Sequence, residues 1–228
     1  MSVRQPGLPE LGADPSRTYR LGLMGGTFDA IHSGHLVTAE QAREALCLDL
    51  VLFMPAGQPA FKQGRGVTPA EDRYAMTLLA TAANPAFDAS RFEIDREGIT
   101  YTVDTLRALR AHYPENVRLF FITGADAILD ILSWRNAAEI ARLATLIAAT
   151  RPGYDINQAC ERVEGSGLPF DVRYIEIPAL AVSSSYIRER VAEGKSVRYL
   201  TSESVMGYIK KNGLYRRDHQ ERVEGAEV

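Results

Sequence analysis

The sequence predicts an α/β fold in which a doubly wound, Rossmann-like and mostly parallel sheet is followed by helices at the C-terminus. Short apolar runs alternate with helical patterns along most of the chain, which is typical of parallel strands joined by helices. The run VRLFFI at 117–122 is nearly all apolar, as expected when helices cover both faces of a sheet. Residues of chemical interest follow the ends of such runs, where ligands bind in these sheets.

One long region carries this alternation. We expect residues 18–215 to form a single domain. Residues 1–17 and 216–228 are polar and rich in charge or in Pro and Gly, so we expect them to be loose tails.

The elements of the first half follow from apolar runs and helix signals. Strands are predicted at 20–24 (RLGLM) and 50–54 (LVLFM), with a helix at 34–46 between them. The segment TPAE at 68–71 has threonine, proline and glutamate at the N-cap, N1 and N3 positions of a capping box, so a helix is expected to begin there. A short strand is expected at 91–94.

The second half continues the pattern. A helix that opens at Thr102 or Asp104 would present Val103, Leu106 and Leu109 on one face. Further strands are expected at 117–122, 143–149 and 172–177, and two last helices at 184–192 and 201–211.

Composition and charge exclude several classes of protein. The 228 residues are 46% hydrophobic and 24% charged with a formal net charge of -3, which argues against a nucleic-acid partner. Cys47 and Cys160 lie far apart, which fits a reducing compartment and gives no thiolate zinc site. The sequence shows no signal-peptide pattern and no apolar run near the roughly 20 residues that span a bilayer. We therefore expect a soluble, cytoplasmic protein with no membrane partner, and a homo-oligomer is compatible with these features.

The segment GGTFDAIHSGH at 25–35 carries the strongest chemical signal. Gly25 and Gly26 follow a strand and let backbone amides approach a phosphate. His32 and His35 stand three residues apart at the start of a helix, so both imidazoles share one side. The helix N-terminus adds partial positive charge. Together these groups predict a pocket for anionic oxygens.

Other interpretations of this segment stay open. A Gly-Gly pair after a strand is often only a turn. The two histidines could bind zinc with Asp29 as a third ligand, although no further His or Cys is suitably placed. A P-loop is excluded because Gly-Lys-Ser/Thr is missing.

A second candidate phosphate site is the segment VSSSYIR at 182–188. Ser183 and Ser184 at a helix start supply an N-cap and leave backbone amides available. Arg188 follows one turn later, with a planar fork that matches phosphate oxygens. The alternative is an ordinary capped amphipathic helix that packs on the sheet.

The two segments resemble the signatures of the HxGH nucleotidyltransferase superfamily, relatives of class I aminoacyl-tRNA synthetases. The chain departs from the usual patterns at Ala30, where proline is common, and at Ser185, where threonine is common. The resemblance implies that 18–215 is a nucleotidyltransferase domain.

The middle of the chain resembles bacterial nicotinate mononucleotide adenylyltransferases. The segment GITYTVDTL at 98–106 is similar to their REGxSYTxDTL, and GAD at 124–126 with Trp134 eight residues later is similar to their GADxxxxxxxW. The RPG at 151–153 and the ending YI…GLY at 208–215 also match, so the similarity runs from about residue 20 to 215. The chain departs from the family at 60–62, where it has AFK and the family often has Pro-His-Lys. It also has Asp72 before Arg73, where the family usually has His.

The resemblance implies a site for ATP. Backbone amides of the glycine segment would hold the nucleotide, His32, His35 and Arg188 would be catalytic, and the serine cap would hold the leaving phosphates. The expected ATP-binding residues are Gly25, Gly26, Thr27, Phe28, His35, Gly124, Asp126, Arg151, Ser183, Ser184 and Arg188.

The acceptor site is expected around a predicted helix start and an aromatic ring. Thr102 lies at a helix N-terminus, which favours a carboxylate such as that of nicotinate. Trp134 offers a flat apolar face for a pyridine ring, and the alternative is a core anchor. The resemblance implies that Tyr101 and Lys62 also bind the acceptor. The alternative for Tyr101 is ordinary packing at a strand end. Lys62 could close over phosphates or be a solvated loop lysine.

We therefore expect adenylyl transfer from ATP to nicotinate mononucleotide, giving nicotinate adenine dinucleotide and pyrophosphate, a step of NAD biosynthesis. The acceptor phosphate would attack the α-phosphorus in line, with Mg²⁺ carried by the ATP phosphates and no protein metal site. The alternatives are a related enzyme with another acceptor, such as pantetheine phosphate, and a non-catalytic nucleotide-binding protein.

Overall fold

The structure is a computed structural model that describes residues 7–59 and 66–216. Its centre is a six-stranded sheet in which every pair of neighbouring strands is parallel. The strand order is β4-β2-β1-β6-β7-β8. The strands are β1 (Tyr19–Gly26), β2 (Leu50–Pro55), β4 (Phe87–Ala89), β6 (Val117–Gly124), β7 (Thr145–Thr150) and β8 (Val172–Glu176). The predicted doubly wound α/β class is confirmed.

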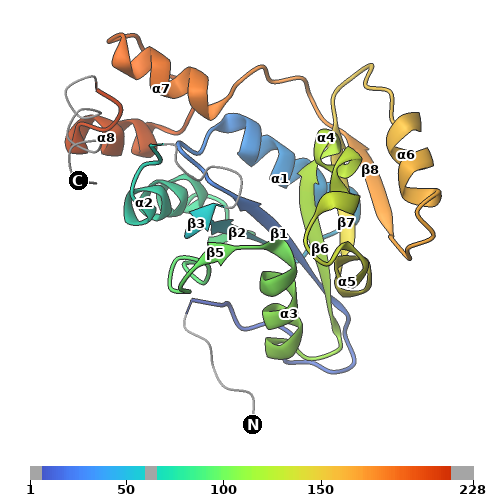
Figure 1. Cartoon of the computed structure of the whole chain (residues 1–228). Helices are drawn as coiled ribbons and strands as arrows, with labels where there is room; N and C mark the ends of the chain where they lie inside the picture. The colour runs from blue at the N-terminus through green and yellow to red at the C-terminus, as the bar shows by residue number, and fades with distance from the viewer. Residues whose placement is uncertain (1–6, 60–65, 217–228) are drawn as a thin grey trace.

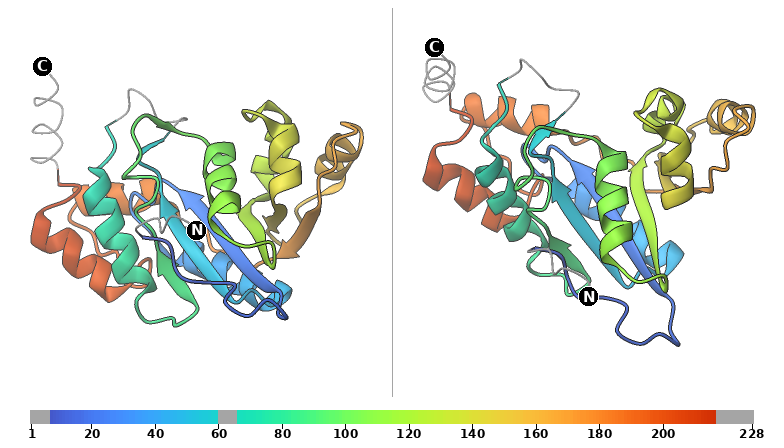
Figure 2. Two further views of the ribbon diagram at one scale, coloured as in Figure 1. Left: turned by 90° about the horizontal axis from the view of Figure 1, so that it is seen from below. Right: turned by 60° about the horizontal axis from the view of Figure 1, so that its bottom comes forward.

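Helices connect the strands and lie on both sides of the sheet (Figures 1 and 2). A short 3-10 helix, η2 (Ile131–Ser133), and a two-stranded sheet of β3 (Gln58–Pro59) and β5 (Ile99–Thr100) complete the elements. The helices are α1 (Ser33–Leu46), α2 (Ala70–Thr81), α3 (Thr102–His112), α4 (Ala125–Leu129), α5 (Ala137–Leu143), α6 (Asn157–Glu164), α7 (Ser184–Ala192) and α8 (Glu203–Asn212).

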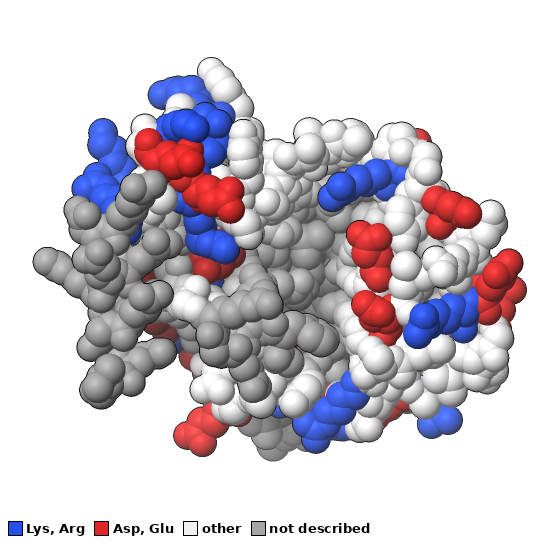
Figure 3. Space-filling model, turned by 45° about the horizontal axis from the view of Figure 1, so that its top comes forward, with Lys and Arg blue, Asp and Glu red and all other residues white. Residues whose placement is uncertain are grey.

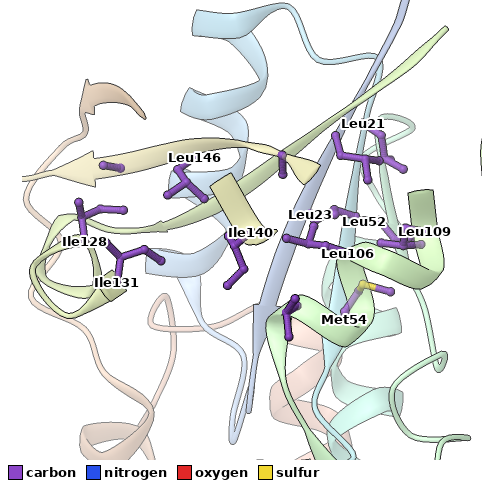
Figure 4. Close-up of a cluster of buried hydrophobic side chains, with 14 of the residues drawn as sticks. Leu21, Leu23, Leu52, Met54, Leu106, Leu109, Ile128, Ile131, Ile140 and Leu146 are labelled. Atoms are coloured by element: carbon purple, nitrogen blue, oxygen red, sulfur yellow. The ribbon is translucent and has the colours of Figure 1, made fainter. Parts of the chain in front are cut away.

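Alternation along β1 divides the core into two clusters. Leu21 and Leu23 face a cluster formed with α3, α4, α5 and α6, part of which is drawn in Figure 4. Met24 faces the opposite cluster, formed with α1, α2, α7 and α8. Because both faces of each central strand are buried, the strands read as apolar runs and not as alternating patterns.

The strand order creates a switch point between β1 and β6. From β1 the chain moves outward to β2 and β4, then returns to β6 and continues to β7 and β8. Such a reversal opens a crevice beyond the carboxyl ends of the two central strands. Gly25 and Gly26 end β1, and Gly124 ends β6, so the predicted site segments meet at this crevice.

One predicted element is wrong, and the N-cap of another differs from the prediction. The strand expected at 91–94 is a turn, closed by the Ile94 amide on the Arg91 carbonyl at 2.8 Å; β4 pairs with β2 instead, at Phe87–Ala89. Helix α2 is present as predicted but begins at Ala70, with Pro69 and not Thr68 as its N-cap and without a side-chain cap. The Thr68 amide donates to the Asp29 carboxylate at 3.3 Å.

The N-terminal segment also differs from the loose tail that we expected. The carbonyl of Gly7 accepts a hydrogen bond from Ser90, and that of Pro9 accepts one from Tyr113. Leu8 packs against the core. Residues 7–17 therefore lie on the body of the protein. In the described ranges, none of the helices is long and apolar enough to cross a membrane.

Candidate active site

His32 and His35 form a stacked pair at the start of α1. His32 is the N-cap residue, and its backbone N–H donates to Nδ1 of His35 at 3.2 Å. The ring centroids lie 3.7 Å apart with an angle of 25° between the planes. Because Nδ1 of His35 accepts a hydrogen bond, the ring proton is assigned to Nε2. His35 can thus donate from Nε2 into the cavity that it lines.

Burial keeps His32 uncharged. The side chain is 7% exposed, and burial lowers the pKa of His32 to about 4 because the charged imidazolium is poorly solvated. A neutral His32 can stack on His35 without repulsion between like charges. A Cβ at Gly34 would lie 3.0 Å from Nδ1 of His32, so a larger residue there would force the His32 ring to shift.

The two glycines that end β1 have different reasons to be glycine. A Cβ at Gly26 would lie 3.0 Å from the ring of Phe28, which is buried and makes an edge contact with His35 at 5.0 Å between centroids. A Cβ at Gly25 would meet only the Phe121 ring, at an ordinary 3.5 Å. Gly26 therefore makes room for the packing of the loop, whereas Gly25 leaves its backbone open to a ligand.

The second predicted motif lies against the first. Ser183 caps α7 by accepting the Tyr186 amide at 3.1 Å. Ser184 donates from Oγ to the Ala30 carbonyl at 2.9 Å, and Arg188 donates to the Asp29 carbonyl. Segments that are about 150 residues apart in sequence are thus in direct contact at the β1–α1 loop.

Asp29 does not face the two histidines as a third zinc ligand. Its carboxylate accepts the hydroxyl of Tyr215 at 2.7 Å and the amide of Thr68 at 3.3 Å. Among the described residues no group of three or more His, Cys, Asp or Glu side chains could hold a metal ion.

A cavity of about 450 Å³ opens on the β6–β7 side of the switch point. Gly25 and His35 line one wall, and α4 and the end of β7 form the other. The predicted adenosine-side residues Gly124, Asp126 and Arg151 all line it. In Figure 3 a hollow lies between two groups of side chains, and both groups include basic and acidic residues.

A second cavity of about 190 Å³ opens on the other side of β1. It is lined by Gly25, Thr27, Thr102 and Trp134. Gly25 and Thr123 line both cavities, so the two spaces meet at the carboxyl ends of β1 and β6. A ligand in one cavity can therefore reach a ligand in the other.

Trp134 separates this second cavity from a further one of about 410 Å³ beside α3. The indole makes an edge contact with Phe121 at 6.0 Å between centroids. Tyr101 is the N-cap residue of α3 and lines the outer cavity, with the Arg135 guanidinium 4.6 Å from its ring centre. The amide of Thr102 begins α3, where helix geometry provides no intrahelical acceptor.

Sequence reasoning missed two charged residues around the site. Glu93 lines the second cavity and accepts the Thr105 hydroxyl at 2.7 Å; burial raises the pKa of Glu93 to about 7. Arg73, which is 1% exposed, donates to the carbonyls of Thr27 at 2.9 Å and Gly57 at 3.1 Å. Lys62 lies outside the described residues.

Comparisons with known proteins agree with this geometry. The cytidylyltransferase-like family model matches residues 23–190. A probable nicotinate-nucleotide adenylyltransferase of Thermoanaerobacter sp. (strain X514) is 50% identical over 209 residues, covering 91% of this chain and 99% of the relative. One from Moorella thermoacetica is 53% identical over 207 residues, covering 88% and 94%.

A solved structure shares the fold. The nicotinic acid mononucleotide adenylyltransferase of Plasmodium falciparum, complexed with NaAD, superposes with a TM-score of 0.69 at 19% identity, covering 86% of this chain and 97% of that one. With its cytidylyltransferase-like domain and its relatives at about half identity over nearly their whole length, the chain belongs to the nicotinate-nucleotide adenylyltransferase family.

Proposed function

We propose that this protein transfers the adenylyl group of ATP to nicotinate mononucleotide, releasing pyrophosphate and forming nicotinate adenine dinucleotide. One observation carries the proposal: the cavity lined by Asp126 and the cavity lined by Trp134 meet at Gly25 and Thr123. The stacked histidines lie beside this junction. The larger would take ATP and the smaller the pyridine ring of the acceptor. Their junction would then hold the α-phosphorus and the attacking phosphate oxygen.

The ATP side would work by positioning and charge neutralisation. The bond from the α-phosphorus to the bridging oxygen of pyrophosphate breaks as the acceptor oxygen attacks from the opposite side. Negative charge grows on the leaving pyrophosphate, where His35 Nε2–H and the Arg188 guanidinium would donate hydrogen bonds. Asp126 lines the same cavity, and its carboxylate would accept hydrogen bonds from the ribose hydroxyls of ATP.

The acceptor side would recognise a carboxylate on a flat cationic ring. Trp134 borders both smaller cavities, and its face would stack on the pyridinium ring with an attraction of about 0.5–2 kcal/mol. The first amides of α3, beginning at Thr102, would donate to the nicotinate carboxylate. The NH₂ group of nicotinamide is itself a donor and could not accept hydrogen bonds from these amides. The site would therefore bind nicotinate mononucleotide better than nicotinamide mononucleotide.

Magnesium would enter with the substrate. The cavities carry two carboxylates, Asp126 in the larger and Glu93 in the smaller. The other predicted site groups are imidazole, guanidinium, hydroxyl and backbone N–H groups, which donate to phosphate oxygens and are poor ligands for a hard cation. Mg²⁺ carried by the ATP phosphates would supply further neutralisation of the leaving pyrophosphate. We propose that MgATP is the substrate.

The test is a product assay with a panel of acceptors. The protein is incubated with MgATP and nicotinate mononucleotide, nicotinamide mononucleotide or pantetheine phosphate, and the dinucleotide and pyrophosphate are measured. We expect nicotinate adenine dinucleotide with one equivalent of pyrophosphate, and less product from the amide. Preferred turnover of pantetheine phosphate would identify a different acceptor, and ATP binding without pyrophosphate release would contradict catalysis.

A further inference from the structure

The last described residues are buried, although they follow the final helix. Gly213 ends α8 in the left-handed region with a φ of 65°, and this turn directs Leu214 and Tyr215 back into the molecule. Tyr215 is 6% exposed and lies in the core cluster of α1, α2, α7 and α8. Figures 1 and 2 show α8 beside α2, on the side of the sheet that carries α7.

The Tyr215 hydroxyl reaches the loop between β1 and α1. It donates to Oδ1 of Asp29 at 2.7 Å and lies 3.8 Å from the sulfur of Met76. Oδ2 of the same carboxylate accepts the Thr68 amide at 3.3 Å. Asp29 is 3% exposed, so this carboxylate is buried and its hydrogen bonds are costly to lose. Burial and the nearby carboxylate raise the pKa of Tyr215, so the hydroxyl keeps its proton.

The loop that Asp29 belongs to is held by its carbonyl groups as well. The carbonyls of the loop accept hydrogen bonds from four side chains on distant segments: Arg73 on Thr27, Arg188 on Asp29, Ser184 on Ala30 and Thr201 on Ile31. This loop joins the glycine amides to the stacked histidines. Its position therefore sets the distance between these two groups of phosphate donors.

Arg188 makes the loop part of the chemistry. The Arg188 guanidinium donates to the backbone carbonyl of Asp29. The side-chain carboxylate of Asp29 accepts the hydroxyl of Tyr215. A shift of Asp29 would therefore move both Arg188 and the segment that leads from Asp29 to His32. Tyr215 thus holds the residue on which the second phosphate motif rests.

We propose that Tyr215 is a positioning residue for adenylyl transfer, acting through the Asp29 carboxylate to fix the β1–α1 loop and Arg188 against the triphosphate. The inference rests on the proposed function for its catalytic readout. Tyr215 is buried and lines neither of the two cavities. It keeps the donors aligned during the in-line displacement, where small misplacements are costly.

The test compares two tyrosine-to-phenylalanine variants. Tyr215→Phe removes the hydroxyl that holds Asp29. Tyr208→Phe is the matched control, since the Tyr208 hydroxyl donates to Asp72 on α2 at 2.8 Å, whereas the Tyr215 hydroxyl donates to Asp29 of the loop. We expect Tyr215→Phe to lower kcat by about 10- to 100-fold, with the KM for nicotinate mononucleotide nearly unchanged, while Tyr208→Phe keeps both values. Equal kcat values in the two variants would overturn the proposal.

Two further measurements separate positioning from simple stability. Because Tyr215 acts through Asp29, the double variant Tyr215→Phe/Asp29→Asn should lose little more kcat than Asp29→Asn alone; additive losses would contradict this. Hydrogen exchange of a peptide covering residues 27–36 should be faster in Tyr215→Phe than in Tyr208→Phe at a temperature where both are folded. Unchanged exchange would overturn the proposal.

The exchange measurement also keeps the two proposals distinct. If the wild-type protein forms no dinucleotide with any acceptor, the proposed function fails. Faster exchange in Tyr215→Phe would then still show that Tyr215 holds the loop, and the same variant should bind MgATP more weakly than Tyr208→Phe in calorimetry. Equal MgATP affinity together with equal exchange would reject the positioning role.

Discussion

A single imidazole is the residue on which turnover is expected to depend most. His35 accepts the His32 amide through Nδ1 and faces the larger cavity, so its Nε2–H is directed by the fold and not by the substrate. Such preorganisation makes a donor effective when charge develops in a reaction. Phe28 supports the ring from the side.

We predict that His35→Ala lowers kcat by about 100- to 1,000-fold, which is the loss caused by removing one hydrogen-bond donor from an oxyanion hole. The fold should persist, because the ring faces a cavity. Circular dichroism and thermal unfolding provide the stability check, and His112→Ala, at the far end of α3, is the control. Wild-type-like turnover of His35→Ala would remove the role assigned to His35.

A buried carboxyl gives the protein a pH-dependent stability. The pKa of Glu93 is raised to about 7 from an ordinary 4.5 because burial disfavours the carboxylate. Between these two pH values the unfolded chain gives up a proton that the folded chain keeps. The free energy of unfolding therefore falls as pH rises from about 4.5 to about 7, by about 3 kcal/mol in full.

We predict that Glu93→Gln removes this dependence. At pH 5 the wild type and the variant should have similar stability, since Glu93 is protonated in the folded state. At pH 8 the variant should be more stable, by up to about 3 kcal/mol, because it no longer buries an ionised group. Urea unfolding at both pH values measures the difference, and an identical difference at pH 5 and pH 8 would refute the cause.

Some of these residues could be assigned to the site from the sequence, and others could not. The glycines and histidines stand next to a strand end, so their chemistry could be inferred. Glu93 could not, because a lone Glu in a short apolar run resembles the solvent side of a strand. The packing reason for Gly26 depends on the Phe28 ring, which is visible only in three dimensions.

At the scale of elements, the sequence predicted the bounds of a helix correctly where the helix is capped by its own neighbouring residues. Helix α7 has the predicted bounds of 184–192, because its serine N-cap is a local feature. Helix α2 lacks the predicted capping box, because the Thr68 amide is bound to the Asp29 carboxylate 39 residues away. The small β3–β5 sheet has two residues per strand, too few to produce a periodic pattern.

Helix α3 gives the most specific element-level prediction. Thr102 is its first residue and Tyr101 already has extended backbone angles, so proline is tolerated at 102. Thr102→Pro removes one N–H that would donate to the nicotinate carboxylate. We predict a KM for nicotinate mononucleotide that is about 10- to 100-fold higher, since hydrogen bonds to charged groups contribute about 1.5–3 kcal/mol.

The control is Thr102→Ala, which keeps the amide and loses the side chain. The KM for ATP should stay unchanged in both variants, because the cavity proposed for ATP lies on the other side of β1. Steady-state kinetics with each substrate varied in turn gives the answer. An equal rise in KM from Thr102→Ala would assign the effect to the side chain and contradict the amide role.

At the scale of the whole molecule, the fold was predictable because it depends on the order of apolar runs. Strand–helix alternation implies a parallel sheet, and a parallel sheet brings strand ends to one edge. The contact of α7 with the β1–α1 loop was expected only from the resemblance of both motifs to one family. The contacts of Tyr215 and Arg73 could not be anticipated, because nothing in a sequence indicates which buried carbonyl or carboxylate a distant side chain will reach.

The central claim is that the glycine loop, His35 and the tip of α7 act on one triphosphate. It is tested by hydrogen exchange of the wild-type protein with and without a non-hydrolysable MgATP analogue. We predict that residues 25–36 and residues 182–190 both become protected, and that both protections are lost together in Arg188→Ala. Protection of the glycine and histidine segment alone, with residues 182–190 exchanging as in the free protein, would contradict the account.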